Sequence, residues 1–161
     1  MNARDNILKA IHFETPEFIP MTFKINDACW NSYPRAALLE LMETHPFLFP
    51  DFCPTDFPER PAFSNVARKD QPYRDDFGCL WQTTADGITG TVTDHPLSSW
   101  DSFASYQAPD PACCMGIGPI SWTSEKQRIE KRKSQKLLTK AGLRHGHTFL
   151  QLCDIRGYEN L

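Results

Sequence analysis

The sequence predicts an α/β protein that begins a repeating β/α fold and does not complete it within 161 residues. An alternating apolar segment at 19–26 is followed by a polar loop and an amphipathic helix, which is the order of a β/α unit. A second apolar segment at 148–153 leads into what reads as the start of another helix. Two strands are too few for a stable sheet, so we expect the chain to be the first part of a larger domain.

The N-terminal residues predict a helix, a strand and a second helix. Residues 2–13 have an apolar face at helical spacing, and the helix should end at Thr15-Pro16. Residues 19–26 alternate as a strand does. The side packed on helices would consist of Met21, Phe23 and Ile25, and the side facing the barrel interior of Thr22, Lys24 and Asn26. The second helix should begin near Ser32 and Pro34 and stop at His45-Pro46.

The rest of the sequence predicts an irregular insertion, then a helix and a strand. Most of the thirteen prolines fall between 46 and 120, and prolines exclude long helices. Within this insertion, Asp86-Gly87 lies between two alternating segments and predicts a β-hairpin over 77–93. A helix should run from about 121 to 140, and the second strand should occupy 148–153. The expected parts of the one incomplete domain are 1–45, 46–120 and 121–161.

The composition excludes several classes of protein. A net charge of −3 gives no global attraction to nucleic acid, and acidic residues interleave the basic run at 126–140, which therefore predicts a solvated helix face. No signal peptide and no apolar stretch of membrane-spanning length is present, so we expect a cytoplasmic protein. The six cysteines fit no C-x-x-C motif and should be free thiols.

Several segments, taken in order, resemble one family. The opening reads Asn2-x-x-Asp5-x-Ile7-Leu8-x-Ala10-Ile11-x-Phe13-x-x-Pro16-x-x-Ile19-Pro20. It is followed by Ile25-Asn26-Asp27-Ala28-Cys29-Trp30, Asp86-Gly87-Ile88-Thr89-Gly90, His95-Pro96-Leu97 and Arg156-Gly157-Tyr158-Glu159-Asn160-Leu161. The set resembles the N-terminal portion of uroporphyrinogen decarboxylase-like proteins, which include corrinoid-linked methyltransferases. The resemblance implies a (β/α)8 barrel about twice this length, with the hairpin as an insertion.

The resemblance implies methyl transfer in the full-length protein, with zinc and a corrinoid partner, and no cofactor held by this chain. True uroporphyrinogen decarboxylases carry an arginine pair after the first strand, whereas residues 26–31 contain no arginine. Guanidinium groups bind substrate carboxylates well. Because this loop lacks them, methyl transfer is favoured, and decarboxylation of a porphyrinogen is the alternative. A non-catalytic binding module is a further alternative. Alone, the chain is expected to be inactive and to associate with itself through open sheet edges.

Candidate substrate-binding residues follow the two expected strands, because active sites of barrels lie at the C-terminal ends of strands. After the first strand these are Lys24, Asn26, Asp27 and Cys29, and after the second they are Cys153, Asp154 and Arg156. Asp27 and Asp154 could equally serve only to cap helices. His145 and His147 could suggest a metal with Cys153, but their place at the start of the strand favours a structural role, so no metal site is expected.

Overall fold

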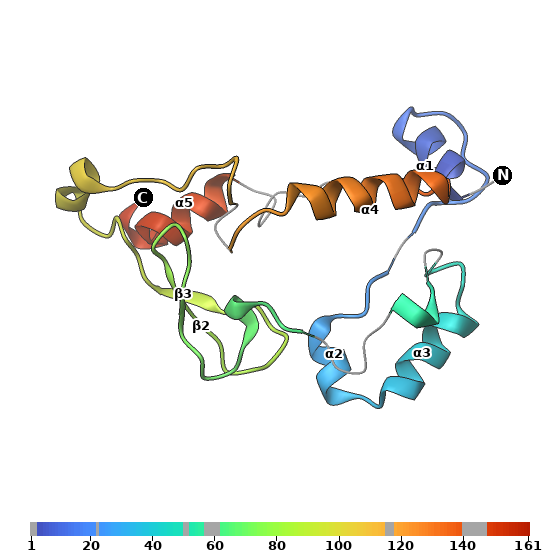
Figure 1. Cartoon of the computed structure of the whole chain (residues 1–161), viewed down its shortest axis with the longest axis horizontal. Helices are drawn as coiled ribbons and strands as arrows, with labels where there is room; N and C mark the ends of the chain where they lie inside the picture. Colours follow the sequence, from blue (N-terminus) through green and yellow to red (C-terminus); the bar gives the residue numbers. More distant parts are fainter. Residues whose placement is uncertain (1–2, 22, 50–51, 57–61, 115–117, 140–147) are drawn as a thin grey trace. The chain divides into compact units, whose positions relative to one another are not determined.

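The computed structural model describes residues 3–21, 23–49, 52–56, 62–114, 118–139 and 148–161. The chain forms two compact units. Unit 1 combines Met1–Pro61 with Trp122–Lys140, and unit 2 combines Ala62–Ser121 with Ala141–Leu161. Figure 1 shows helices together with a small sheet, so the chain has the mixed helix-and-strand composition that the sequence predicts.

The regular secondary structure in the described part of unit 1 consists of helices. Helix α1 spans Ala3–Ile11, α2 spans Asp27–Ser32, α3 spans Arg35–Thr44, the 3₁₀ helix η1 spans Pro54–Asp56 and α4 spans Trp122–Ser134. The sequence predictions of α1 and α3 are confirmed, including the end of α3 at His45. Helix α4 starts as predicted but is shorter than expected, because Lys136 adopts a left-handed φ of 57° and Leu137 N–H turns back to the carbonyl of Arg132.

A buried asparagine fixes the path of the chain after α1. The side chain of Asn6 is fully buried; its amide donates to the Phe18 carbonyl at 2.9 Å, and its oxygen accepts from Glu17 N–H at 2.7 Å. A buried amide needs such partners to offset its desolvation. Phe18 then packs edge-to-face on Phe47, with ring centroids 5.0 Å apart.

The strand predicted at 19–26 is wrong. The described residues of this segment lie outside any helix or strand; Phe23 N–H donates to Leu48 O, and Asn26 O accepts from Cys29 N–H at the start of α2. Phe23 is 57% exposed and the Lys24 side chain 85% exposed, so the alternation does not separate a helix-packed side from an interior side. The prediction failed because period-two alternation makes a strand only where a neighbouring strand completes the backbone hydrogen bonds.

Unit 2 contains a three-stranded antiparallel sheet in the order β1–β2–β3. Strand β1 is Tyr73–Arg74, β2 is Leu80–Gln82 and β3 is Thr91–Asp94. The described residues of unit 2 also form the helices η2 (Asn65–Ala67), η3 (Trp100–Ser105), α5 (Thr148–Arg156) and η5 (Tyr158–Asn160), of which α5 is an α-helix and the others are 3₁₀ helices. The predicted hairpin is confirmed as β2–β3, with Trp81 opposite Val92 and Gln82 opposite Thr91.

The core of unit 2 lies where the hairpin meets α5. Val66, Cys79 and Trp81 are almost fully buried, and Ile155 of α5 packs against them. Figure 1 shows α5 beside the β2–β3 pair. Burying a large aromatic side chain is worth a few kcal/mol (about 2–3), so Trp81 is the main apolar anchor of this unit. The core therefore joins two segments far apart in sequence.

The second strand predicted at 148–153 is also wrong, because these residues form most of α5. A short apolar run cannot be assigned to strand or helix by periodicity alone. Leucine and glutamine favour helix, and Gly157, with φ of 85°, ends the helix by donating its N–H to Cys153 O at 2.8 Å. The β/α order expected from two strands is therefore not formed by the described residues.

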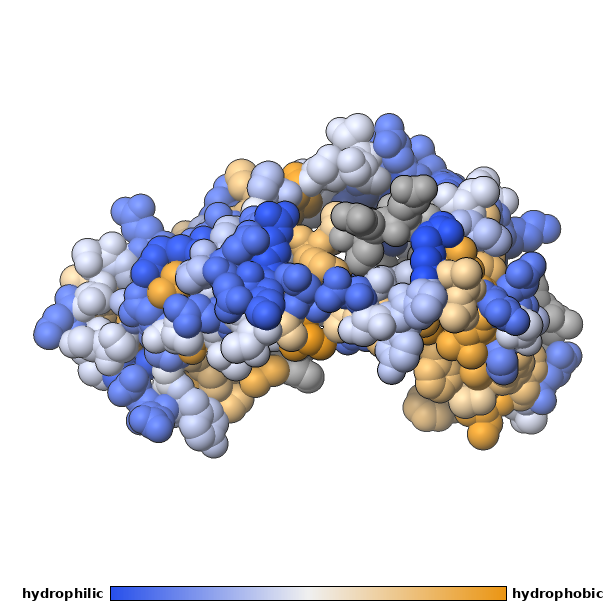
Figure 2. All heavy atoms as spheres, turned by 90° about the horizontal axis from the view of Figure 1, so that it is seen from below, coloured by the Kyte–Doolittle hydropathy of each residue, from blue (hydrophilic) through white to orange (hydrophobic). Residues whose placement is uncertain are grey.

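Large apolar side chains remain exposed in both units, as the orange surface in Figure 2 illustrates. Phe13 is 99% exposed, and others with more than half of their surface exposed include Ile19, Trp100, Trp122, Phe149 and Tyr158. No helix in the described ranges is long and apolar enough to cross a membrane.

Candidate functional site

The first group of predicted site residues lies around the start of α2 in unit 1. Asn26 is the N-cap of this helix, and its side-chain oxygen accepts from Ala28 N–H at 2.8 Å. Lys24 forms an ion pair with Asp27 at 3.6 Å, and both side chains are largely solvated. Cys29 is half-buried, with a carbonyl that accepts from Tyr33 N–H. Capping accounts for the contacts of Asn26, and an exposed ion pair contributes little stability.

The second group of predicted site residues lies on α5 in unit 2. The backbone carbonyl of one of them, Asp154, faces the residues of the hairpin and the segment after it. The carbonyl of Asp154 accepts two hydrogen bonds, from Cys79 Sγ at 3.2 Å and from His95 Nδ1 at 2.8 Å. Because a carbonyl only accepts, Nδ1 of His95 must carry a proton. Cys153 is half-buried and uses its carbonyl to cap the helix end.

Arg156 is held by contacts within unit 2. Its Nη1 donates to Leu97 O at 2.7 Å, and its Nε donates to Asn160 O at 2.9 Å. The guanidinium also lies 4.0 Å from the centre of the Trp100 ring, a cation–π contact. Arg156 therefore joins three segments of unit 2, and its Nε and Nη1 donors already face backbone carbonyls.

A buried carboxylate beside β2 was missed by the sequence reasoning. Asp75 is 5% exposed; Oδ1 accepts from Cys79 N–H at 2.9 Å and Oδ2 accepts from the Trp81 indole at 2.8 Å. Gly78, with φ of 88°, closes the turn by donating its N–H to Asp75 O. The turn residues Asp75-Asp76-Phe77-Gly78 were the available signal, since a carboxylate before a glycine turn often bonds backbone N–H groups.

The phenol of Tyr106 lies close to the turn that contains Asp75. Its hydroxyl donates to Phe77 O at 3.2 Å. Burial raises the pKa of Tyr106, and the negative charges of Cys79 and Asp75 raise this pKa further. Tyr106 also lines a small cavity of about 340 Å³ together with Asp76 and Gln107.

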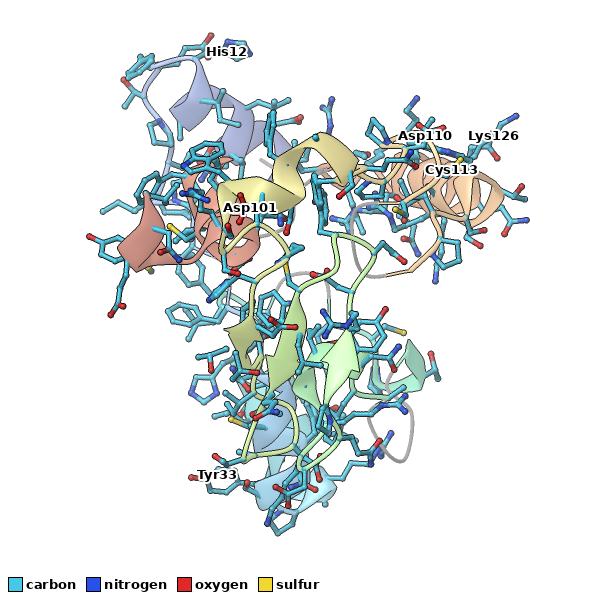
Figure 3. The ribbon with its side chains drawn as sticks, turned by 90° about the vertical axis from the view of Figure 1, so that its left-hand side faces the viewer. His12, Tyr33, Asp101, Asp110, Cys113 and Lys126 are labelled. Atoms are coloured by element: carbon cyan, nitrogen blue, oxygen red, sulfur yellow. The ribbon has the colours of Figure 1, made fainter. Side chains whose placement is uncertain are left out.

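The adjacent cysteines 113 and 114 lie in a turn that Asp110 organises, and Figure 3 shows Asp110 and Cys113 close together. The thiol of Cys113 is 3.5 Å from Asp110 Oδ2, and the hydrogen bond and the charge of this carboxylate raise the pKa of Cys113. A protonated thiol is a poor nucleophile and metal ligand.

The residues that the structure describes contain no group of three His, Cys, Asp or Glu side chains placed to hold a metal ion. His145 and His147 lie outside the described residues. Comparison with protein-family models, curated proteins and solved structures finds no match to this chain.

Proposed function

We propose that this chain contributes the N-terminal portion of a uroporphyrinogen decarboxylase-like (β/α)8 barrel, and that the intact protein transfers a methyl group carried by a corrinoid. One observation carries the proposal. Three of the segments that resemble the family lie in unit 2, and two of them, 95–97 and 156–161, are in direct contact.

The meeting points are specific contacts between these segments. His95 bonds the carbonyl of Asp154, Arg156 bonds the carbonyl of Leu97, and Gly157 packs so closely that an added Cβ would lie 3.2 Å from the His95 ring. Residues of two family-like segments therefore pack against each other in unit 2. Scattered chance matches would not be expected to contact one another in this way.

Methyl transfer is favoured over porphyrinogen decarboxylation by the positions of the arginines. A substrate with many carboxylates needs guanidinium groups that are free to bind them. None lies between residues 26 and 31, and Arg156 already bonds two carbonyls. The methyltransferases of the family that this chain resembles build their zinc site from His and Cys in the later half of the barrel, so we assign any zinc ligands of the intact enzyme to that half.

The test is a pair of assays on the intact protein that contains this chain. Methylcobalamin with 2-mercaptoethanol reports methyl transfer through the absorbance change as the cobalt–carbon bond breaks. Uroporphyrinogen reports decarboxylation through released CO₂. Methyl loss without CO₂ release is the expected result. CO₂ release alone would replace the proposal with decarboxylation, and inactivity in both assays would favour a non-catalytic module.

A further inference from the structure

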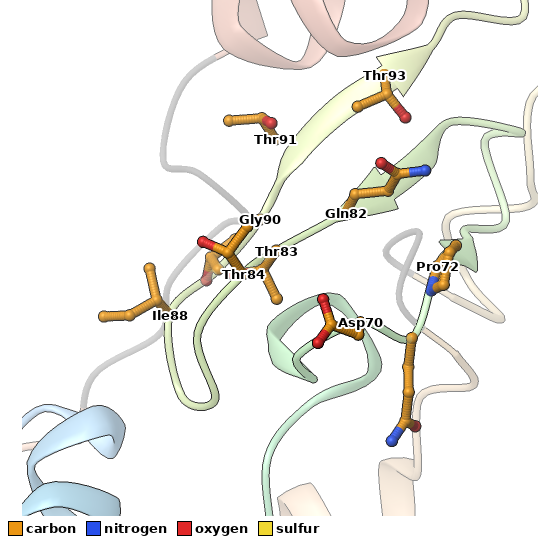
Figure 4. Close-up of a pocket in the computed structure, with 11 residues that line it drawn as sticks. Asp70, Pro72, Gln82, Thr83, Thr84, Ile88, Gly90, Thr91 and Thr93 are labelled. Carbon is orange, nitrogen blue, oxygen red and sulfur yellow. The ribbon is translucent and has the colours of Figure 1, made fainter.

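We propose that the solvent-facing groove of the unit 2 sheet binds a neutral polyhydroxylated ligand, of the size of one monosaccharide. The proposal does not rest on the proposed methyl transfer. The groove has a volume of about 580 Å³, within the range of about 300–1,000 Å³ that is typical of small-ligand sites. Figure 4 shows Gln82 of β2 between β3, which carries Thr91 and Thr93, and the turn that carries Asp70 and Pro72.

Backbone hydrogen bonds hold the walls of the groove in place. Asp70 N–H donates to Thr83 O at 3.1 Å, and Gly90 N–H donates to Val66 O at 2.8 Å. Lys69 N–H donates to the Asp86 carboxylate at 2.8 Å. The turn at 68–70 and the hairpin loop at 83–90 are thus tied together, so a ligand would find the site largely preorganised.

Two backbone features shape this groove. A Cβ on Gly90 would lie 2.2 Å from Gln82 O, so only glycine allows the two sides of the hairpin to approach this closely. Asp70 has a left-handed φ of 54°, which aspartate tolerates better than most residues. The chain therefore places an aspartate at the groove in a backbone conformation that few other side chains adopt.

The lining side chains offer both hydrogen-bond donors and hydrogen-bond acceptors. Cross-strand partners Gln82 and Thr91 share one face of the sheet, and Thr93 follows on the same face. Within the described residues, no intramolecular hydrogen bond engages the polar side-chain groups of Asp70, Gln71, Gln82, Thr84, Thr89 or Thr91. Hydroxyls and amides both donate and accept, as the hydroxyls of a sugar do.

The charge and apolar lining of the groove select among polar ligands. Among the described residues that line the groove, Asp70 is the one that carries a charge. A carboxylate accepts hydrogen bonds from two adjacent hydroxyls, and it disfavours a phosphate or carboxylate ligand. Pro72 and Ile88 supply apolar surface that suits the C–H face of a sugar ring. The combination fits a neutral polyol.

The experiment uses the 161-residue chain and three neutral probes, D-glucose, D-ribose and myo-inositol. Saturation-transfer difference NMR detects binding, and a titration gives Kd, which should be millimolar for an open groove. D-glucuronate carries the same ring as glucose with an added charge and should bind at least several-fold more weakly. Asp70→Asn, which keeps the shape and tolerates the same φ, and Thr91→Val should each weaken binding of the best neutral probe, by about tenfold for the aspartate.

Thr123→Val on α4 is the matched control and should bind as the unchanged chain does. Circular dichroism checks that each variant folds, and Thr89→Val replaces Thr91→Val if the latter disrupts β3. Absence of binding by all three neutral probes overturns the proposal. So does equal binding of glucuronate and glucose, or unchanged affinity in Asp70→Asn.

Discussion

The indole N–H of Trp81 donates a 2.8 Å hydrogen bond to the buried carboxylate of Asp75. This pair couples the turn at Asp75–Gly78 to the apolar core of unit 2, because Asp75 also accepts from Cys79 N–H while Trp81 packs beside Val66. A buried carboxylate is tolerated only when its oxygens have such donors.

Asp75→Ala should therefore be strongly destabilising. It leaves buried donors of Trp81 and Cys79 without this acceptor, which should lower the free energy of unfolding by about 2–4 kcal/mol. Urea unfolding followed by circular dichroism measures the effect. Asp76→Ala removes the neighbouring exposed carboxylate and should cost at most about 1 kcal/mol. Equal costs for the two variants would show that the buried bonds do not stabilise the unit.

Gly157→Ala should destabilise unit 2 more than Gly118→Ala. Both glycines have nearly the same positive φ, 85° and 86°, so alanine is strained at either position. At Gly157 the new Cβ would also lie 2.9 Å from the Asn160 amide and 3.2 Å from His95, whereas nothing lies within 4 Å at Gly118. We therefore expect the larger loss in the free energy of unfolding at Gly157. A larger loss at Gly118 would contradict it.

The elements predicted correctly from sequence are those with local signals. Helix α3 has a proline before its first turn and His45-Pro46 after its last, and the hairpin has Asp86-Gly87 between two alternating segments. These signals act within a few residues and need no distant partner. The helix at 3–11 is likewise set by its own apolar face.

The two strands failed because their signals were not local. The alternation at 19–26 needed a neighbouring strand, and at its end Asn26 instead caps α2. The apolar run at 148–153 was compatible with either state, and Gly157 at the helix end was the overlooked sign. The turn signal at Asp75 indicated a bond to a nearby backbone N–H, but the bonds from the Trp81 indole to Asp75 and from His95 to Asp154 had no sequence signal.

Tyr106 should ionise above the usual tyrosine range of about pH 10. Burial and the nearby negative charges of Cys79 and Asp75 favour the neutral phenol, so its pKa is raised in the folded state. The stability that this group contributes is present below the unfolded pKa and is lost as the pH rises through the raised folded pKa. Phenolate absorbance should show a late-titrating component that Tyr106→Phe removes. Identical titration curves for both proteins would contradict this account.

Asp110→Asn should speed alkylation of Cys113 at neutral pH. The Asp110 carboxylate raises the pKa of Cys113 through a hydrogen bond and its charge, so removing the charge increases the thiolate fraction. The asparagine oxygen can still accept the Ala112 N–H bond that shapes the turn. Mass spectrometry after timed iodoacetamide treatment should show a several-fold faster reaction at Cys113, with Cys29 as the internal control. An unchanged rate at Cys113 would rule out control by Asp110.

The proposed function depends most directly on the contact between His95, which follows the hairpin, and the end of α5. Long-range ¹⁵N–¹H NMR of the His95 ring tests it most directly, because the 2.8 Å contact with Asp154 O requires a proton on Nδ1. We expect the neutral ring to be protonated at Nδ1 and not at Nε2, with a nuclear Overhauser contact between the ring and Gly157. A neutral ring protonated at Nε2, or the absence of a contact to Gly157, would contradict the convergence of family-like segments on which the proposed function depends.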